Sequence, residues 1–209
     1  MKKSISLFLV ILFLAGCAAP QHRTVQPVDH PKLPAVRQMV GELAHENGLD
    51  PQKIYVAIIE DNAINAWIDD RPIMFITTAL IEAVPDDDSL KCVLAHELSH
   101  YALNHIAKSQ ATSIGVSAVF QVADIFVPGL GLLNLLANPT ITSSYGRANE
   151  LEADATAVLM CEQAGMVDAR DKMITMLAWL GAQRKGNQQQ VSLWSTHPSI
   201  EDRINNLKN

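Results

Sequence analysis

Hydrophobic and polar residues alternate along this chain with two spacings, and the spacings predict its order of elements. Positions three and four residues apart mark amphipathic helices, whereas short β-branched runs bounded by turn residues mark strands. Helices are predicted at 35–48, 78–84, 89–109, 146–164, 168–184 and 199–207. Strands are predicted at 53–60, 64–68 and 73–76. The fold class expected from this order is α+β, mainly helical, with one small three-stranded sheet.

The first 30 residues follow a different pattern. Two lysines precede an apolar run that is too short to span a bilayer, and the run ends in Leu14-Ala15-Gly16-Cys17. This resembles the signal of bacterial lipoproteins, in which cleavage precedes the cysteine and lipid is added to it. We therefore predict a signal peptide at 1–16, lipid on Cys17, a polar tether at 17–30 and one domain at 31–209. An ordinary secretory signal and an uncleaved anchor remain alternatives.

A lipoprotein signal predicts an address in the bacterial cell envelope. The lipid on Cys17 would hold the chain to a membrane, facing the periplasm. Residue 18 is alanine, not the aspartate that retains many lipoproteins in the inner membrane, so the outer membrane is favoured.

Composition and charge narrow the classes of function. The formal net charge is −6 and no long basic run occurs, which argues against nucleic acid as a partner. Three cysteines are too few for a disulfide scaffold. Cys92 and Cys161 are expected as buried thiols on two helices, with a disulfide between them left open.

The stretch at 112–137 is unusually apolar but is interrupted by Gln121, Asp124 and Pro128. These residues make a membrane span a poor interpretation. A hinged lid over a groove and an ordinary helical hairpin of the core both fit the pattern.

The strongest chemical signal is His96-Glu97-Leu98-Ser99-His100 within a predicted helix. Two histidines four residues apart share one helix face, so both rings can bind one zinc ion. Glu97 then stands beside the open metal position as a general base. The pattern is typical of zinc peptidases, although two surface histidines would give it too.

A third ligand is expected from another helix. His105 falls about 180° from His96 on a continued helix, so we expect it to point away. In the segment 150–154 (ELEAD), Glu150 and Asp154 share a face, whereas Glu152 points elsewhere, toward solvent and surface charge. Glu150 is therefore predicted as the ligand, with Asp154 hydrogen-bonding a zinc-bound imidazole.

HELSH followed by ELEAD resembles the HtpX and CAAX-prenyl-protease type of zinc metallopeptidases, metallopeptidase family forty-eight or minigluzincins. The resemblance runs from about 54 to 203 and is greatest to small periplasmic lipoprotein members. It includes the strand Asn65-Ala66-Trp67, the segment 77–80 (TTAL), and Thr196-His197-Pro198 with Arg203 beyond. The turn at 69–72 (DDRP) departs from the glycine that many members carry.

The resemblance implies a zincin-like fold, one zinc ion per chain, and a role near the zinc for His197. That histidine could be a fourth ligand that blocks the water site or a donor to the oxyanion; a helix cap is the third interpretation. Arg203 would hold this loop or pair with an acidic neighbour.

The function predicted from these residues is hydrolysis of unfolded or misfolded envelope proteins by metal-activated water, with the proton moved by Glu97. The strand at 64–68 would align an extended substrate by β-addition. A chaperone-like lipoprotein partnered with the outer-membrane assembly machinery, and a structural lipoprotein with vestigial zinc, are the alternatives. A glutamate at 97 argues against both, because metal binding alone needs no base.

Overall fold

The computed structural model describes residues 27–105, 146–186, 197 and 200–209. The helices of these parts are α1 (Leu33–Glu46), α2 (Thr78–Ala83), α3 (Asp87–Ala102), α6 (Arg147–Gln163), α7 (Ala169–Gly186) and α9 (Ile200–Lys208), with a 3-10 turn η1 (Pro51–Lys53). The strands are β1 (Tyr55–Ile59), β2 (Ala66–Ile68) and β3 (Ile73–Thr77). The α+β class and the small three-stranded sheet are confirmed.

The sheet has the order β1-β3-β2. β1 runs parallel to β3, with Tyr55 opposite Ile73, while β2 and β3 form an antiparallel hairpin with Ile68 opposite Met74. This hairpin is the one that the sequence predicts around residues 69–72, and Asp69 holds the turn by accepting hydrogen bonds from the backbone and side chain of Arg71. β2 is consequently an edge strand of this sheet.

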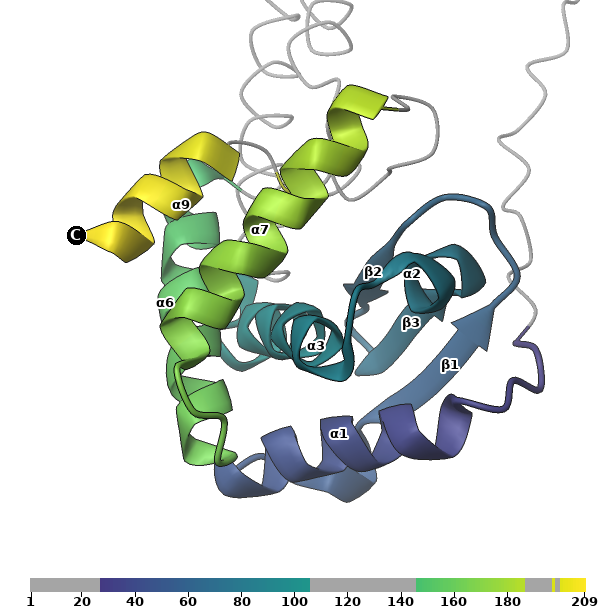
Figure 1. Ribbon diagram of the computed structural model, residues 1–209. Coiled ribbons are helices and arrows are strands. Elements are labelled where there is room, and N and C mark those ends of the chain that lie inside the picture. Colours follow the sequence, from purple (N-terminus) through teal and green to yellow (C-terminus); the bar gives the residue numbers. More distant parts are fainter. Residues whose placement is uncertain (1–26, 106–145, 187–196, 198–199) are drawn as a thin grey trace, which may run out of the picture.

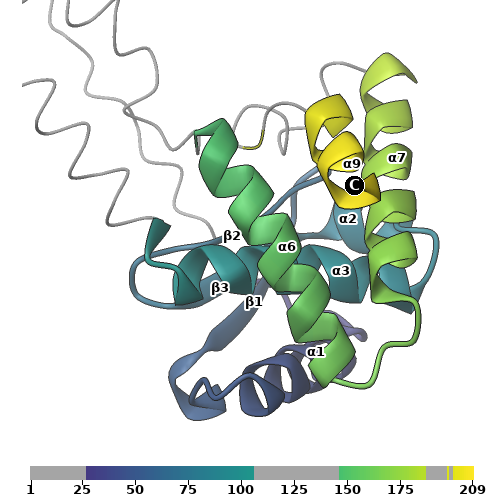
Figure 2. The ribbon, with the colours of Figure 1, turned by 90° about the vertical axis from the view of Figure 1, so that its left-hand side faces the viewer.

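Helix α3 lies at the centre, with the sheet on one side and α6 and α7 on the other (Figures 1 and 2). From Ser89 to His100 every residue except Lys91 is buried. A helix surrounded by other elements must be apolar on most of its surface, and Leu90, Leu94 and Leu98 supply the core contacts. Polar side chains on such a helix are therefore held away from bulk water.

The helix boundaries lie within two residues of the predicted ones, except at the end of α3. Helix α2 is capped by Thr77, whose hydroxyl accepts from the Leu80 N–H. Helix α3 ends at Ala102 and not at 109, because Asn104 adopts a positive φ of 56° that breaks the helical path. In its first turn Asp86 caps the helix, and Asp87 and Asp88 stand at the positive end of the helix dipole.

Several predictions fall outside the described residues. These are the signal peptide, Cys17 and most of the tether, the lid or hairpin at 112–137, and the residues on either side of His197. Among the helices that the structure does describe, none combines the length and apolarity needed to cross a membrane.

Candidate metal centre

Helix α3 brings three polar side chains to one buried point. His96 and His100 lie four residues apart, and their Nε2 atoms are 3.1 Å from each other. The rings meet edge to face with centroids 4.7 Å apart. Both side chains are buried, as is Glu97 between them in sequence. The helical spacing thus places the two imidazoles on one face, as the sequence predicts.

Helix α6 crosses α3 and adds a carboxylate to this point (Figure 2). Oε1 of Glu150 lies 3.4 Å from His100 Nε2, and Oε2 lies 3.5 Å from His96 Nε2. Glu150 is fully buried. Burial alone would raise its pKa, but hydrogen bonds from His100, His197 and His96 outweigh this effect and hold the pKa far below its usual range. Glu150 is therefore an ionised, acceptor-only group.

His197 completes the group from a segment more than thirty residues beyond α6. Its Nδ1 lies 3.0 Å and 3.1 Å from the two oxygens of Glu150 and 3.3 Å from His96 Nε2. One potential donor atom from each of His96, His100, Glu150 and His197 lies within 4.8 Å of the others. His197 therefore points into the centre and does not merely cap α9.

Asp154 and Arg203 form a buried ion pair behind His96. Arg203 Nε and Nη2 donate to the two oxygens of Asp154 at 2.7 Å each, and Asp154 Oδ1 lies 2.9 Å from His96 Nδ1. Arg203 Nη1 also reaches Glu150 Oε2 at 3.0 Å. Asp154 is thus within hydrogen-bond reach of a ring nitrogen, as predicted, and Arg203 pairs with an acidic neighbour of the site.

These charges set the pKa values around His96. Burial and the Arg203 charge act to lower the pKa of His96, but hydrogen bonds to Asp154 and Glu150 outweigh them and raise it to about 9. Burial acts to raise the pKa of Asp154, and the charge and hydrogen bonds of Arg203 lower it to about 2 instead. For His100 burial dominates, and its pKa lies well below the usual value.

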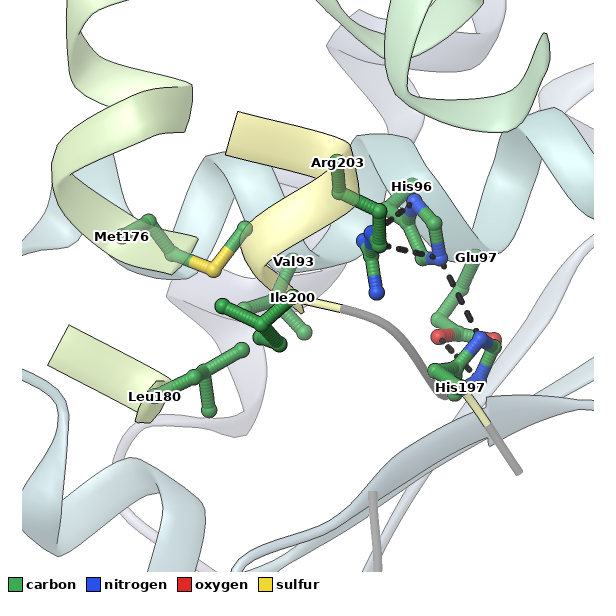
Figure 3. Close-up of a pocket in the computed structure, with 8 residues that line it drawn as sticks. All are labelled: Val93, His96, Glu97, Met176, Leu180, His197, Ile200 and Arg203. Atoms are coloured by element: carbon green, nitrogen blue, oxygen red, sulfur yellow. Dashed lines mark hydrogen bonds and ion pairs between the residues drawn. The ribbon is translucent and has the colours of Figure 1, made fainter. Parts of the chain in front are cut away.

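Glu97 differs from the other carboxylates of the centre. Within the described residues neither of its oxygens makes a hydrogen bond, and Oε1 lies 3.4 Å from His197 Nε2. A cavity of about 20 Å³ adjoins it, with His96, His197 and Arg203 on one side (Figure 3) and four apolar side chains on the other: Val93, Met176, Leu180 and Ile200. Such a volume holds about one water molecule. Burial raises the pKa of Glu97, which brings this carboxylate closer to the range of a general base.

One residue does not lie where the sequence predicts, and a second has a different partner. His105 was expected on the far side of α3, but α3 has ended before it, and its Nδ1 lies 2.9 Å from His100 Nδ1. Glu152 faces solvent as predicted, with its side chain 53% exposed, but its partner is not surface charge: its Oε2 lies 3.2 Å from His105 Nε2. Both errors come from extending α3 as an ideal helix beyond Ala102. The asparagine at 104, a residue that tolerates the left-handed conformation, was the one local signal for the turn.

Cys92 and Cys161, the two cysteines within the described residues, are buried and free. A hydrogen bond between Cys92 and Cys161 and their burial raise the pKa of Cys92, so its thiol stays protonated. They lie on α3 and α6, the two helices that carry HELSH and ELEAD, as expected.

The residues of this centre fit a zinc ion. Neutral imidazole nitrogens and a carboxylate oxygen are ligands that zinc prefers. Without a metal, hydrogen bonds from the Nε2 atoms of both α3 histidines reach the ionised Glu150. A zinc ion would take the place of these protons and leave each ring with its proton on Nδ1 and its Nε2 lone pair facing the ion, where the two Nε2 atoms lie 3.1 Å apart. Lone pairs at that distance repel, so a cation among these atoms stabilises the arrangement. The described residues thus define the class of protein, a metallopeptidase of the HExxH type with a glutamate on a second helix.

Comparison with known proteins identifies the family. Residues 32–209 match peptidase family M48, and the chain belongs to this family. It is 23% identical to metalloprotease LoiP of Escherichia coli (strain K12) over 168 residues, which cover 78% of this chain and 64% of that protein. It is 26% identical to a protease HtpX homolog of Acidiphilium cryptum over 221 residues, covering 88% and 76%. It is 25% identical to protease HtpX of Legionella pneumophila, covering 83% and 75%. The zinc metallopeptidase class and the zinc cofactor predicted from the sequence are thereby confirmed.

Proposed function

We propose that this protein is a zinc-dependent endopeptidase that holds one zinc ion through His96, His100 and Glu150. The observation that carries the proposal is Glu97: a buried carboxylate, without a hydrogen bond inside the described residues, beside a water-sized cavity and the cluster of ligand atoms. A purely structural zinc site needs no such group.

The residues of the chain divide the work of peptide hydrolysis. Zinc, when bound, would act as a Lewis acid: it would polarise the scissile carbonyl and lower the pKa of a bound water molecule to about 7. Glu97 takes a proton from the attacking water and delivers it to the leaving amine. Asp154, held by both arms of Arg203, fixes the ring of His96 through its Nδ1.

His197 has two candidate roles with opposite consequences. As a fourth ligand it would occupy the water position at rest, and its contacts with Glu150 and His96 support this role. As an oxyanion donor it would stabilise the transition state, which its Nε2 beside Glu97 supports. His197→Ala raises basal proteolysis in the first case and lowers kcat by roughly 10²–10³ in the second. An unchanged rate and zinc affinity would remove both roles.

The proposed substrates are unfolded or misfolded proteins of the bacterial envelope. β2 is the edge strand of the sheet and packs against α3, so an extended chain added to it would lie beside the centre. Recognition through backbone groups gives broad specificity and requires an unfolded chain. The proposed location is the periplasmic face of the outer membrane, where lipid on Cys17 would anchor the protein.

The activity is tested with the chain from residue 18 onward, which omits the predicted lipid site Cys17, loaded with one equivalent of zinc, on an unfolded casein-type substrate. Glu97→Gln should abolish cleavage and keep zinc, because the amide takes up no proton. Glu46→Gln, an exposed position at the end of α1, is the matched control and should cleave like the wild type. A wild type that suppresses aggregation but cuts nothing, with Glu97→Gln behaving identically, would favour the chaperone-like lipoprotein of outer-membrane assembly.

The ligand assignment is tested on one helix. Glu150→Gln should lose most of its zinc, as measured by metal content after dialysis. Glu162→Gln, exposed near the end of the same helix α6, should keep one zinc per chain. Full zinc occupancy in Glu150→Gln would contradict the proposed ligand set.

A further inference from the structure

The turn after α3 returns a third histidine of this region to the centre. Asn104, in the left-handed conformation, donates its N–H to the Tyr101 carbonyl, and the chain leaves the path of α3. The side chain of His105 is thereby fully buried. Its ring lies 5.0 Å from the ring of His100, centroid to centroid, with the planes at 65°. The chain thus places an imidazole against the side of His100 that faces away from Glu150.

Both nitrogens of His105 have a partner on a different helix. Nδ1 lies 2.9 Å from His100 Nδ1 on α3, and Nε2 lies 3.2 Å from Glu152 Oε2 on α6. The Glu152 side chain is 53% exposed, whereas the His105 side chain is 0% exposed. A continuous series of contacts therefore runs from a solvent-facing carboxylate, through His105, to the ring of His100.

The Glu152 carboxylate determines which ring nitrogen of His105, and in turn of His100, carries a proton. An ionised carboxylate only accepts hydrogen bonds, so a neutral His105 donates its Nε2–H to Glu152. Nδ1 of His105 is then an acceptor, and His100 must donate its Nδ1–H to it. With zinc bound, that tautomer gives the Nε2 lone pair of His100 to the ion, beside Glu150 Oε1 at 3.4 Å and His96 Nε2 at 3.1 Å.

We propose that His105, held by Glu152, is a positioning residue that fixes the ring orientation and tautomer of His100, so that His100 presents Nε2 to the zinc ion. The proposal rests on the proposed function, in which His100 is a ligand. It gives each histidine of α3 its own orienting group: Asp154 with Arg203 for His96, and His105 with Glu152 for His100. Glu152, Asp154 and Glu150 then have separate tasks on one helix.

The experiment measures the zinc dissociation constant of the mature chain by competition with a chromophoric chelator. His105→Leu should weaken zinc binding by about 10–100-fold, because the acceptor for His100 Nδ1–H is gone. His105→Asn should restore most of the loss, since an asparagine Oδ1 takes the position of the histidine Nδ1. His105→Gln places its amide near the former Nε2 and should stay weak. His45→Leu, exposed on α1, is the matched control and should bind like the wild type.

A second readout reports on the tautomer directly. In nitrogen-15 NMR spectra of the zinc-loaded wild type, the His100 ring should show its proton on Nδ1 and the metal on Nε2. Glu152→Gln, at a half-exposed position that does not endanger folding, should weaken zinc binding a fewfold. It should leave the metal on the same nitrogen.

The possible failures can be told apart. If His100→Ala keeps its zinc, the ligand set of the proposed function is wrong. If His100→Ala loses zinc but His105→Leu binds it as tightly as the wild type, the positioning role is wrong. If His105→Leu does not fold, the Asn and Gln variants decide: equal zinc affinities would overturn the role, because only one of them keeps the acceptor. A metal on His100 Nδ1 in the NMR spectrum would overturn it as well.

Discussion

At the scale of single residues, the centre is a set of buried charges that balance one another. Arg203 and its two carboxylate partners, Asp154 and Glu150, are all at most 3% exposed. Burying an unpaired charge costs several kcal/mol, so these groups are stable only as a set. The same pairing orients His96 through Asp154. The pair of Asp154 and Arg203 therefore both orients His96 and balances the buried charges of the centre.

The ion pair predicts a pH dependence of stability. Because the pKa of Asp154 is about 2 in the folded chain against 3.8 ordinarily, ionised Asp154 stabilises the fold at every pH above about 3.8. This contribution is lost as the pH falls toward 2. The difference in unfolding free energy between wild type and Asp154→Asn, measured by urea denaturation of the zinc-free protein, should shrink by about 1 kcal/mol between pH 5 and pH 3.

The surface pair Arg147–Asp202, with side chains 65% and 41% exposed, supplies the control for that measurement. Asp202→Asn should change the unfolding free energy by less than about 1 kcal/mol, because solvent screens an exposed pair. A difference between wild type and Asp154→Asn that stays constant over the same pH range would contradict the assignment of the buried pair.

At the scale of elements, the pairing of β2 with β3 determines which backbone groups of β2 face outward. Asp69 donates its N–H to Ile73, and Thr77 donates its N–H to Asn65, so the odd-numbered residues of this strand pair with β3. In an antiparallel ladder the alternate residues point the other way. The backbone groups of Ala66 and Ile68 therefore face outward, where a substrate strand would pair with them.

This edge predicts that substrates are recognised through their backbone amides more than through their side chains. A peptide substrate with N-methyl groups on alternate amides should be cleaved at least about tenfold more slowly, because each methyl group removes a ladder hydrogen bond. Exchanging its side chains at the same positions should change kcat/KM less. The measurement compares kcat/KM for the plain, N-methylated and side-chain-exchanged peptides. Equal rates for the plain and N-methylated peptides would contradict β-addition.

At the scale of the whole molecule, the lipid and the peptidase domain are expected to act independently. The described domain begins its core at α1, where Val36 and Val40 are buried, and the polar stretch 18–32, which contains three prolines, separates Cys17 from this helix. We expect a polar, proline-containing tether of this kind to hold the domain near the membrane and to let it reach substrates.

Cys17→Ser should therefore release the protein from the membrane fraction without a change in its thermal unfolding midpoint or its rate on an unfolded substrate. Fractionation of envelope membranes and intact-mass analysis check this outcome. An unmodified wild-type chain that begins elsewhere than Cys17 would show that the lipoprotein signal was misread.

The sequence by itself determined the parts of this protein that depend on local periodicity. The 3.6-residue repeat brings His96 and His100 to one face, and likewise Glu150 and Asp154, whatever surrounds the helices. The strands and the hairpin at 69–72 also follow from alternation and turn residues. For the same reason the α+β class and the chemistry of the HELSH motif could be predicted without coordinates.

Only the tertiary structure decided which groups meet across elements. The end of α3 at Ala102 depends on one backbone angle at Asn104, and it turns His105 from the far face to the side of His100. The partner of Glu152, and the depth at which His197 enters the centre, depend on how distant segments pack. Periodicity fixes directions within one helix, whereas contacts between helices depend on crossing geometry and chain reversal. No local pattern encodes these.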